Sequence, residues 1–193
     1  MTDRDALSVA LDDWQTSLFR LEALDQYQAA GEEHLLAAYL RGDRARPFDQ
    51  GLEDWLQRRR DEYATGRRRT RVHAIGGPLT PYLAFEIEWA YTACAEAGED
   101  IRILHCDAWA ETPFGSRPSD FYILDDRTVV VMAYDDAARW VGGELITAPE
   151  QVARFRALRD QALTAAVPLD EYLATPPALV APDLRTAALR NMA

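Results

Sequence analysis

The sequence predicts an α+β fold, with one antiparallel sheet of about five or six strands and helices packed over it. The main observation is residues 120–146, where three apolar runs (121–124, 129–134 and 140–146) are separated by two breaks that each hold a pair of aspartates. Val, Ile, Phe, Tyr and Trp suit a half-buried pleated surface and Asp favours turns, so the stretch predicts a three-stranded antiparallel meander. Strands and helices are also partly segregated along the chain, which favours α+β over a doubly wound parallel sheet.

The chain has 193 residues, of which 48% are hydrophobic and 27% are charged, as in an ordinary soluble protein. We expect a single domain over residues 1–172, followed by a tail of residues 173–193 that contains prolines and alanines. No apolar run approaches the length of a membrane span, and the first residues do not resemble a secretion signal. The cytoplasm is therefore the expected location.

The first half of the chain alternates between helical and strand periodicity. Apolar residues three and four apart indicate amphipathic helices, and two of these are followed by a glycine that suits a helix end. A strict alternation of side chains indicates strands, and the first strand carries Arg20 and Glu22 on one side. The expected helices cover 5–16, 31–40 and 50–64, and the expected strands cover 18–23 and 69–75.

Residues 81–91 carry conflicting signals. Thr80 and Pro81 resemble a helix N-cap followed by proline at the first helical position, whereas the apolar residues from Leu83 to Tyr91 alternate as in a strand. The start signal has a physical mechanism, so we favour a helix and leave the strand open. Beyond it we expect a strand at 101–106, a loop at 109–119, the meander, and a final helix that begins near Pro149 and ends before Pro168.

Charge is distributed unevenly. All 21 basic residues are arginine, and the net charge is −11. Seven arginines lie within fourteen residues beside only Asp61 and Glu62, which makes that segment +5 and the remainder −16 (−11 minus 5). An acidic chain repels nucleic acid at long range, so we expect these arginines to pair with the protein's own carboxylates or with an acidic protein partner. They are Arg58, Arg59, Arg60, Arg67, Arg68, Arg69 and Arg71.

A binding role for RNA or single-stranded DNA is the weaker alternative for the same arginines. In that reading Trp55 and Tyr63 would serve as stacking surfaces for bases.

A second set of charged and polar residues lies at strand ends and at breaks between elements. If they converge, one interpretation is a pocket for a charged small molecule, in which Glu86 or Asp120 acts as general base and Arg20 or Arg102 holds the substrate. The other, which we favour, is a structural ion network that locks the helices to the sheet. The candidates are Arg20, Glu22, Tyr82, Glu86, Asp100, Arg102 and Asp120.

No spacing in the sequence forms a specific catalytic, nucleotide-binding or metal-binding motif. The three histidines and two cysteines are scattered, whereas a metal site needs about four convergent ligands. The paired aspartates are better explained as β-turns than as a calcium loop. We therefore expect no cofactor and no metal.

Several short motifs occur in an order that resembles an uncharacterised actinobacterial family, a domain of unknown function, over roughly residues 18–166. The resemblance implies a small, single-domain cytoplasmic protein of a kind encoded beside helix-turn-helix regulators or in specialised-metabolite gene clusters. The motifs are LFRLE at 18–22, PLTPYL at 78–83, FE at 85–86, AGEDIR at 97–102, DFY at 120–122, LDD at 124–126, Val131, YD at 134–135 and GEL at 143–145.

Two functional expectations follow. The first is a non-enzymatic regulatory or accessory protein that acts through protein contact, with a helix-turn-helix regulator or a biosynthetic enzyme as partner. The alternative is a small enzyme or binding protein for a charged metabolite, which would use the carboxylate and arginine pocket. Nucleic acid and membrane are not expected as partners.

Overall fold

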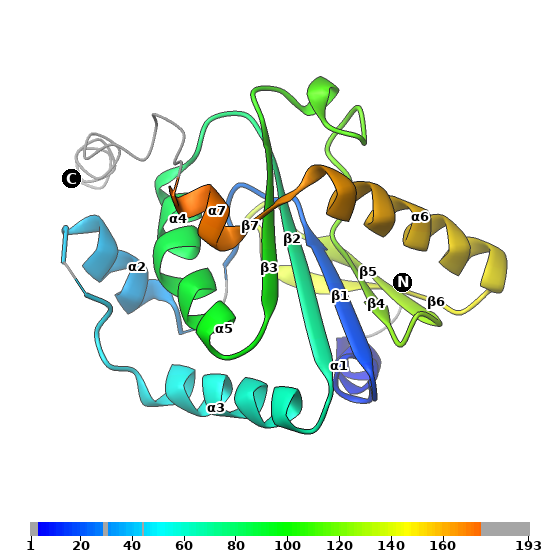
Figure 1. Ribbon diagram of the computed structural model, residues 1–193, viewed down its shortest axis with the longest axis horizontal. Coiled ribbons are helices and arrows are strands. Elements are labelled where there is room, and N and C mark those ends of the chain that lie inside the picture. The colour runs from blue at the N-terminus through cyan, green and yellow to red at the C-terminus, as the bar shows by residue number, and fades with distance from the viewer. Residues whose placement is uncertain (1–3, 29–30, 44, 175–193) are drawn as a thin grey trace.

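A computed structural model of the chain describes residues 4–28, 31–43 and 45–174, and it contains one mixed sheet (Figure 1). The sheet has seven strands in the order β6-β5-β4-β1-β2-β3-β7. The strands are β1 (Ser17–Glu22), β2 (Arg68–Gly76), β3 (Asp100–Cys106), β4 (Phe121–Leu124), β5 (Thr128–Tyr134), β6 (Trp140–Ile146) and β7 (Val167–Pro168).

Helices connect and cover these strands. Figure 1 shows α2, α3 and the α4–α5 helix together at the left and bottom of the view, while α6 lies at the right, over the meander strands. The helices are α1 (Arg4–Asp12), α2 (Glu33–Leu40), α3 (Gln50–Ala64), α4 (Pro81–Phe85), η1 (Glu86–Tyr91), α5 (Thr92–Glu96), η2 (Trp109–Glu111), α6 (Pro149–Ala165) and α7 (Leu169–Ala174).

The α+β class is confirmed, but the prediction of a purely antiparallel sheet is wrong. β1 pairs with β2, and β2 with β3, in parallel. The physical reason is the connection: α2 and α3 link β1 to β2, and the α4–α5 helix links β2 to β3. A helix between two strands returns the chain to the end of the sheet where the first strand began, so the second strand runs parallel to the first.

The C-terminal half of the sheet follows the antiparallel prediction. β4, β5 and β6 form the meander, and β4 also pairs antiparallel with β1. Asp125 and Asp126 form the β4–β5 turn with positive φ angles of 50° and 57°, a conformation that Asp tolerates better than most residues. The Asp125 carboxylate also accepts the backbone N–H groups of residues 15, 16 and 17, so the turn holds the chain entering β1.

Residues 81–96 are helical throughout, and the middle segment η1 is a π-helix. The Thr80 side chain accepts a hydrogen bond from the Leu83 N–H at 3.1 Å, so the expected cap is present. Residues 82–87 are all buried, which explains why their apolar pattern lacked helical periodicity. A π-helix is rare and is frequently found at functional sites.

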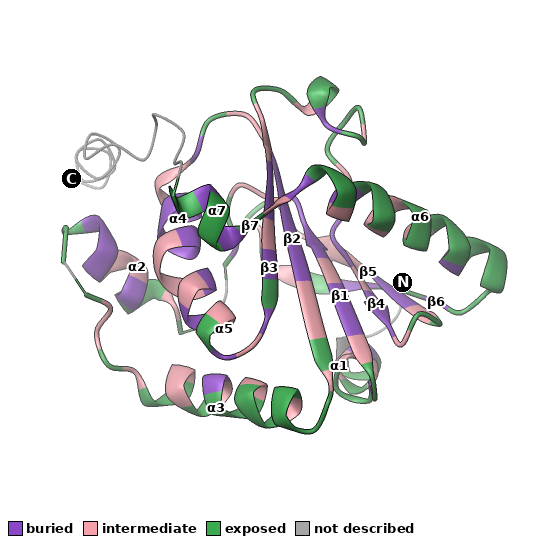
Figure 2. Cartoon of the chain, viewed as in Figure 1, coloured by how far each residue is buried: buried purple, intermediate pink, exposed green. Residues whose placement is uncertain are grey.

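The two faces of the sheet bury different clusters. Phe19, Leu21 and Val72 pack with the α6 residues Val152 and Ala162 on one face. On the other face, apolar residues of β2 and β3 pack against the α4–α5 helix, α3 and α7, and α1 covers Leu124 and Val130 of the meander. Figure 2 shows the central strands buried along most of their length.

The predicted tail lies outside the described residues from position 175 onward. Before it lie two elements that the sequence did not predict: β7, a two-residue edge strand that contains Pro168, and α7. Proline is tolerated on a sheet edge because no ladder partner needs its missing N–H. Across the described parts of the chain, none of the helices combines the length and the apolar character that a membrane crossing requires.

Candidate functional site

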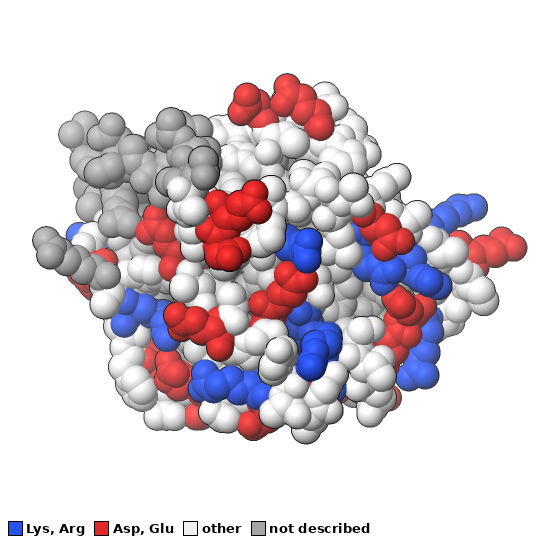
Figure 3. Space-filling model, in the orientation of Figure 1, with Lys and Arg blue, Asp and Glu red and all other residues white. Residues whose placement is uncertain are grey.

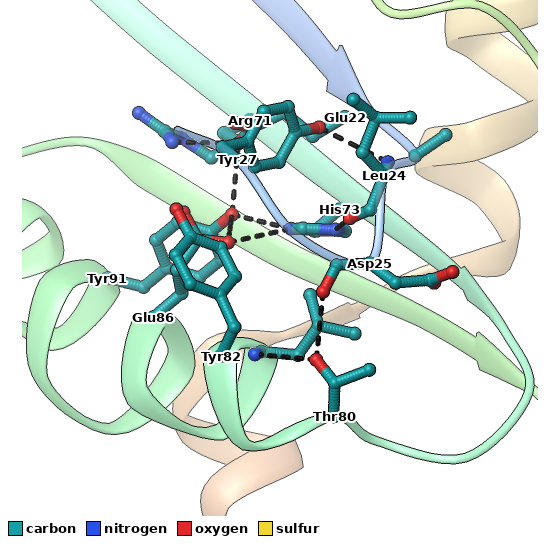
Figure 4. A network of polar contacts seen from close by, with 12 residues as sticks. Glu22, Leu24, Asp25, Tyr27, Arg71, His73, Thr80, Tyr82, Glu86 and Tyr91 are labelled. Carbon is teal, nitrogen blue, oxygen red and sulfur yellow. Dashed lines mark hydrogen bonds and ion pairs between the residues drawn. The ribbon is translucent and has the colours of Figure 1, made fainter. Parts of the chain in front are cut away.

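Four charged side chains form a buried network on the sheet face that carries α4–α5, and Figure 4 shows two of them, Glu22 and Arg71, beside Tyr91, His73 and Glu86. Arg20 and Arg71 lie side by side in the register of β1 and β2, and both contact the Glu22 carboxylate, at 2.6 Å and 2.7 Å. Arg71 also bonds Glu99 at 2.9 Å. Two cations therefore balance two anions, as a buried ionic group requires.

The arginines decide the ionisation of Glu22. Burial by itself would raise the pKa of this carboxyl, but the attraction of Arg20 and Arg71 outweighs it and lowers the pKa to about 2. The Glu22 charge in turn outweighs the burial of both guanidinium groups and raises the pKa of each. Glu22 is 1% exposed, so the network is charged at neutral pH although it lies inside the protein.

Tyr91 links this network to Glu86 and His73. Its hydroxyl lies 2.5 Å from His73 Nδ1, 3.0 Å from Glu22 Oε2 and 3.4 Å from Glu86 Oε2. His73 Nε2 donates to the carbonyl of Leu24, and burial lowers the pKa of this imidazole, so its Nδ1 accepts.

One hydroxyl proton cannot serve three acceptors, so another group in the cluster must bring a proton. Burial, followed by the Glu22 charge, raises the pKa of Glu86 well above its usual range, so Glu86 takes up a proton more readily than Glu22 does. The floor of the site thus combines an ionised Glu22 with a carboxyl group that is harder to ionise.

A cavity of about 950 Å³ lies against this network. Its floor includes Arg20, Glu22, Arg71, Glu86 and Tyr91, and its walls come from α2, α3, α4 and the β5–β6 hairpin. The volume is at the upper end of the range for small-molecule sites. Aromatic side chains are prominent in the lining: Tyr27, Trp55, Tyr82, Phe85, Tyr91, Tyr134 and Trp140.

Asp120 forms a second polar centre beside the cavity. Its carboxylate accepts the Ala23 N–H at 2.9 Å and the hydroxyls of Tyr27 and Tyr134 at 2.6 Å and 3.1 Å. Burial raises the pKa of Asp120 to about 6, although the hydrogen bond from Tyr27 opposes the shift. Asp120 therefore holds two tyrosines of the cavity wall in place.

Asp100 and Arg102 are not in this cluster. In the register of β2 and β3, Arg102 lies beside Val72, on the face that packs against α6. Arg102 bonds Asp100 at 3.2 Å in a pair that is largely solvated. Of the seven candidates, the cavity lining contains Arg20, Glu22, Tyr82 and Glu86.

Most arginines of the basic segment pair with the protein's own carboxylates, which is one of the two arrangements predicted for them. Glu62 holds Arg59 at 2.8 Å and Arg69 at 2.6 Å, with Arg67 at 3.9 Å. Arg67 also stacks over Trp14, with 3.8 Å to the ring centroid. On the face shown in Figure 3, arginines and acidic residues are interleaved.

Glu99, His73 and Tyr91 were not predicted as site residues, and Arg71 was predicted only as a member of the basic segment. The sequence did contain a signal for Arg71 and His73. They flank Val72 along β2, as Arg20 and Glu22 flank Leu21 along β1, so each pair lies on one side of its strand. The parallel pairing that places the two polar sides together was not predicted. Tyr91 was missed because five residues separate it from Glu86, and such a pair shares a face in a π-helix but not in an α-helix.

The fold and the site together define a single-sheet α+β protein with a ligand-sized cavity over a charged sheet surface. Residues 5–174 match the family model of a domain of unknown function, DUF6879, and the chain belongs to this family. Among curated proteins, none matches the chain.

Proposed function

We propose that this protein binds a small, charged organic molecule in the cavity. The observation that carries the proposal is a cavity of about 950 Å³ whose floor is a buried ion network with hydrogen-bonding groups left over. Burying charge is costly, and replacing such a network by apolar residues is often neutral or stabilising. A purely structural network would also not need a hollow beside it.

The groups left over are on Arg20 and Glu86. The buried Nε of Arg20 has no acceptor within the described parts of the chain, and the Arg20 side chain is 20% exposed. Perturbed carboxyls and arginines that meet in a concave site are typical of functional sites. The same geometry leaves general-acid chemistry by Glu86 open as a second role, since burial raises the pKa of this carboxyl.

The test fills the cavity without changing a charge. Ala90 lines the cavity, so Ala90→Phe should occupy part of it, whereas Ala153 is exposed on α6 over the opposite face of the sheet and Ala153→Phe is the control. A panel of organic amines, acids and alcohols is screened by thermal unfolding. A ligand at 100 times its Kd stabilises a protein by about 2.7 kcal/mol, which corresponds to roughly 5–11 °C in a domain of this size.

We expect compounds that raise the unfolding temperature of the parent and of Ala153→Phe but not of Ala90→Phe. If no compound in the panel shifts the parent, or if Ala90→Phe responds equally, the proposal is refuted. The unfolding temperature of each unliganded variant shows whether it is folded.

Regulation through protein contact remains a prediction. In this proposal the bound molecule is the signal and a cytoplasmic helix-turn-helix regulator or biosynthetic enzyme is the partner that responds. Capture of such a partner by the parent but not by Ala90→Phe, with the ligand present, would support the link. Equal capture by both would separate the partner from the cavity.

A further inference from the structure

Three carboxyl groups accompany two arginines at the cavity floor when Glu99, which bonds Arg71 from outside the cavity lining, is counted. Arg20 and Arg71 are matched by Glu22 and Glu99. Glu86 is then left with only the buried His73 at 3.8 Å, whose pKa is lowered by burial. The floor therefore has unused capacity for positive charge.

Glu32 adds to this surplus at the cavity wall. It lines the cavity and makes no ion pair with any residue in the described ranges, and its nearest polar contact is the Tyr82 hydroxyl at 3.4 Å. Burial, and then the Glu22 charge, raise its pKa. A second carboxyl thus faces the cavity without a cation.

Glu86 presents an oxygen to the cavity. Its side chain is 8% exposed, and both of its polar contacts use Oε2. Oε1 makes no hydrogen bond within the part of the chain that is described, and it is not among the buried polar atoms that lack a partner, so it is reached from the cavity. The π-helix produces this arrangement, because it places Tyr91 one turn after Glu86 and so ties Oε2 down.

Aromatic rings surround the same space, and their faces attract cations. Within this protein, the guanidinium of Arg20 already lies over Tyr27 and Tyr122, and that of Arg71 over Tyr91, at 5.0–5.8 Å from the ring centroids. Tyr82 and Tyr134 line the cavity close to these rings. A cation in the cavity would therefore find both carboxyl groups and π-faces.

The other arginines of the lining do not reverse this polarity. Arg46 is paired with Glu53 at 2.9 Å and Arg139 with Asp135 at 2.8 Å. Arg58 also lines the cavity and has no carboxylate partner among the described residues, but it is exposed on α3. We infer that the cavity receives an organic cation such as a protonated amine, whose charge favours the ionised form of Glu86 and makes that carboxylate its partner. This inference rests on the proposed function and names its ligand class.

The test uses three probes that share one aromatic body: 2-(1-naphthyl)ethylamine, 2-(1-naphthyl)ethanol and 3-(1-naphthyl)propanoate. Ligand-observed NMR titrations give the Kd of each for the parent, Glu86→Gln and Glu88→Gln. Glu88 lies in the same π-helix and its replacement removes the same charge, but it does not line the cavity. Gln is isosteric with Glu and cannot ionise.

We expect the amine to bind the parent about tenfold more tightly than the alcohol, or better, because a hydrogen-bonded charge pair is worth that much. Glu86→Gln should abolish this preference, and Glu88→Gln should retain it. Equal binding of amine and alcohol, or an unchanged preference in Glu86→Gln, would overturn the inference while the proposed cavity function stands.

Two further outcomes are decisive. Tighter binding of the propanoate, lost in Arg58→Ala, would show a cavity of the opposite polarity and would also overturn the inference. If none of the three probes binds the parent, and no compound of the wider panel raises its unfolding temperature, both the inference and the proposed function fail.

Discussion

Replacing Arg20 with alanine should destabilise the protein through Glu22. Glu22 is 1% exposed and loses one of its two guanidinium partners in this variant, keeping Arg71 at 2.7 Å and the Tyr91 hydroxyl at 3.0 Å. Breaking a buried ion pair costs about 3–5 kcal/mol. Because two partners remain and Arg20 is 20% exposed to the cavity, we expect the lower end, about 3 kcal/mol.

The matched control is Arg46→Ala. Arg46 is as exposed as Arg20 (22% and 20%) and also lines the cavity, but its partner Glu53 is 34% exposed whereas Glu22 is 1% exposed. A solvated pair of this kind contributes under about 1 kcal/mol. The two variants thus differ mainly in the burial of the carboxylate that is left behind.

Urea unfolding and thermal unfolding measure the effect. A loss of 3 kcal/mol corresponds to roughly 6–12 °C in a domain of this size. The difference between Arg20→Ala and the parent should narrow in acid, because the pKa of Glu22 in the variant lies closer to its ordinary value and the variant therefore has less stability to lose as the pH falls. An unfolding midpoint for Arg20→Ala within about 2 °C of that for Arg46→Ala would refute the reasoning, since it would mean that water already screens Glu22.

Two other predictions concern pH and the β4–β5 turn. The pKa of Glu86 is raised in the folded state, so the stability that this group contributes is complete below its ordinary pKa of 4.5 and is lost as pH rises toward the folded pKa, by about 1.4 kcal/mol per pH unit. Glu86→Gln should therefore be more stable than the parent at pH 8 but not at pH 4. A difference in urea unfolding that stays constant with pH would contradict this. Burial would raise the pKa of Asp125, but backbone N–H donors outweigh it and lower the pKa to about 2, so its contribution is present above about pH 4 and is lost as pH falls toward 2. Asp125→Asn should therefore cost about 1–3 kcal/mol at pH 7, whereas Asp126→Asn, which alters a 49%-exposed partner of Arg159 in the same turn, should cost under about 1 kcal/mol; equal losses in thermal unfolding would show that the turn conformation, and not the hydrogen bonds, is what matters.

Local patterns determined much of this protein. Alternating side chains located β1 and β2, and apolar runs separated by pairs of aspartates located the meander, each to within a residue or so. The Thr80–Pro81 signal identified the start of the helix. These features depend on neighbouring residues, because strand alternation, caps and turns are set by geometry over a few positions. The same alternation placed Arg20 and Glu22 on one side of β1, where the structure has them.

Tertiary structure decided the direction of strand pairing and, with it, the site. Whether β2 runs parallel or antiparallel to β1 depends on how α2 and α3 pack between them, and no local pattern contains that information. The parallel register placed Arg71 and His73 beside Arg20 and Glu22, and it sent Arg102 to the opposite face. The cavity likewise exists because elements far apart in sequence stop short of one another over the sheet, so its volume and its unpaired Glu86 oxygen arise from packing and not from any one segment.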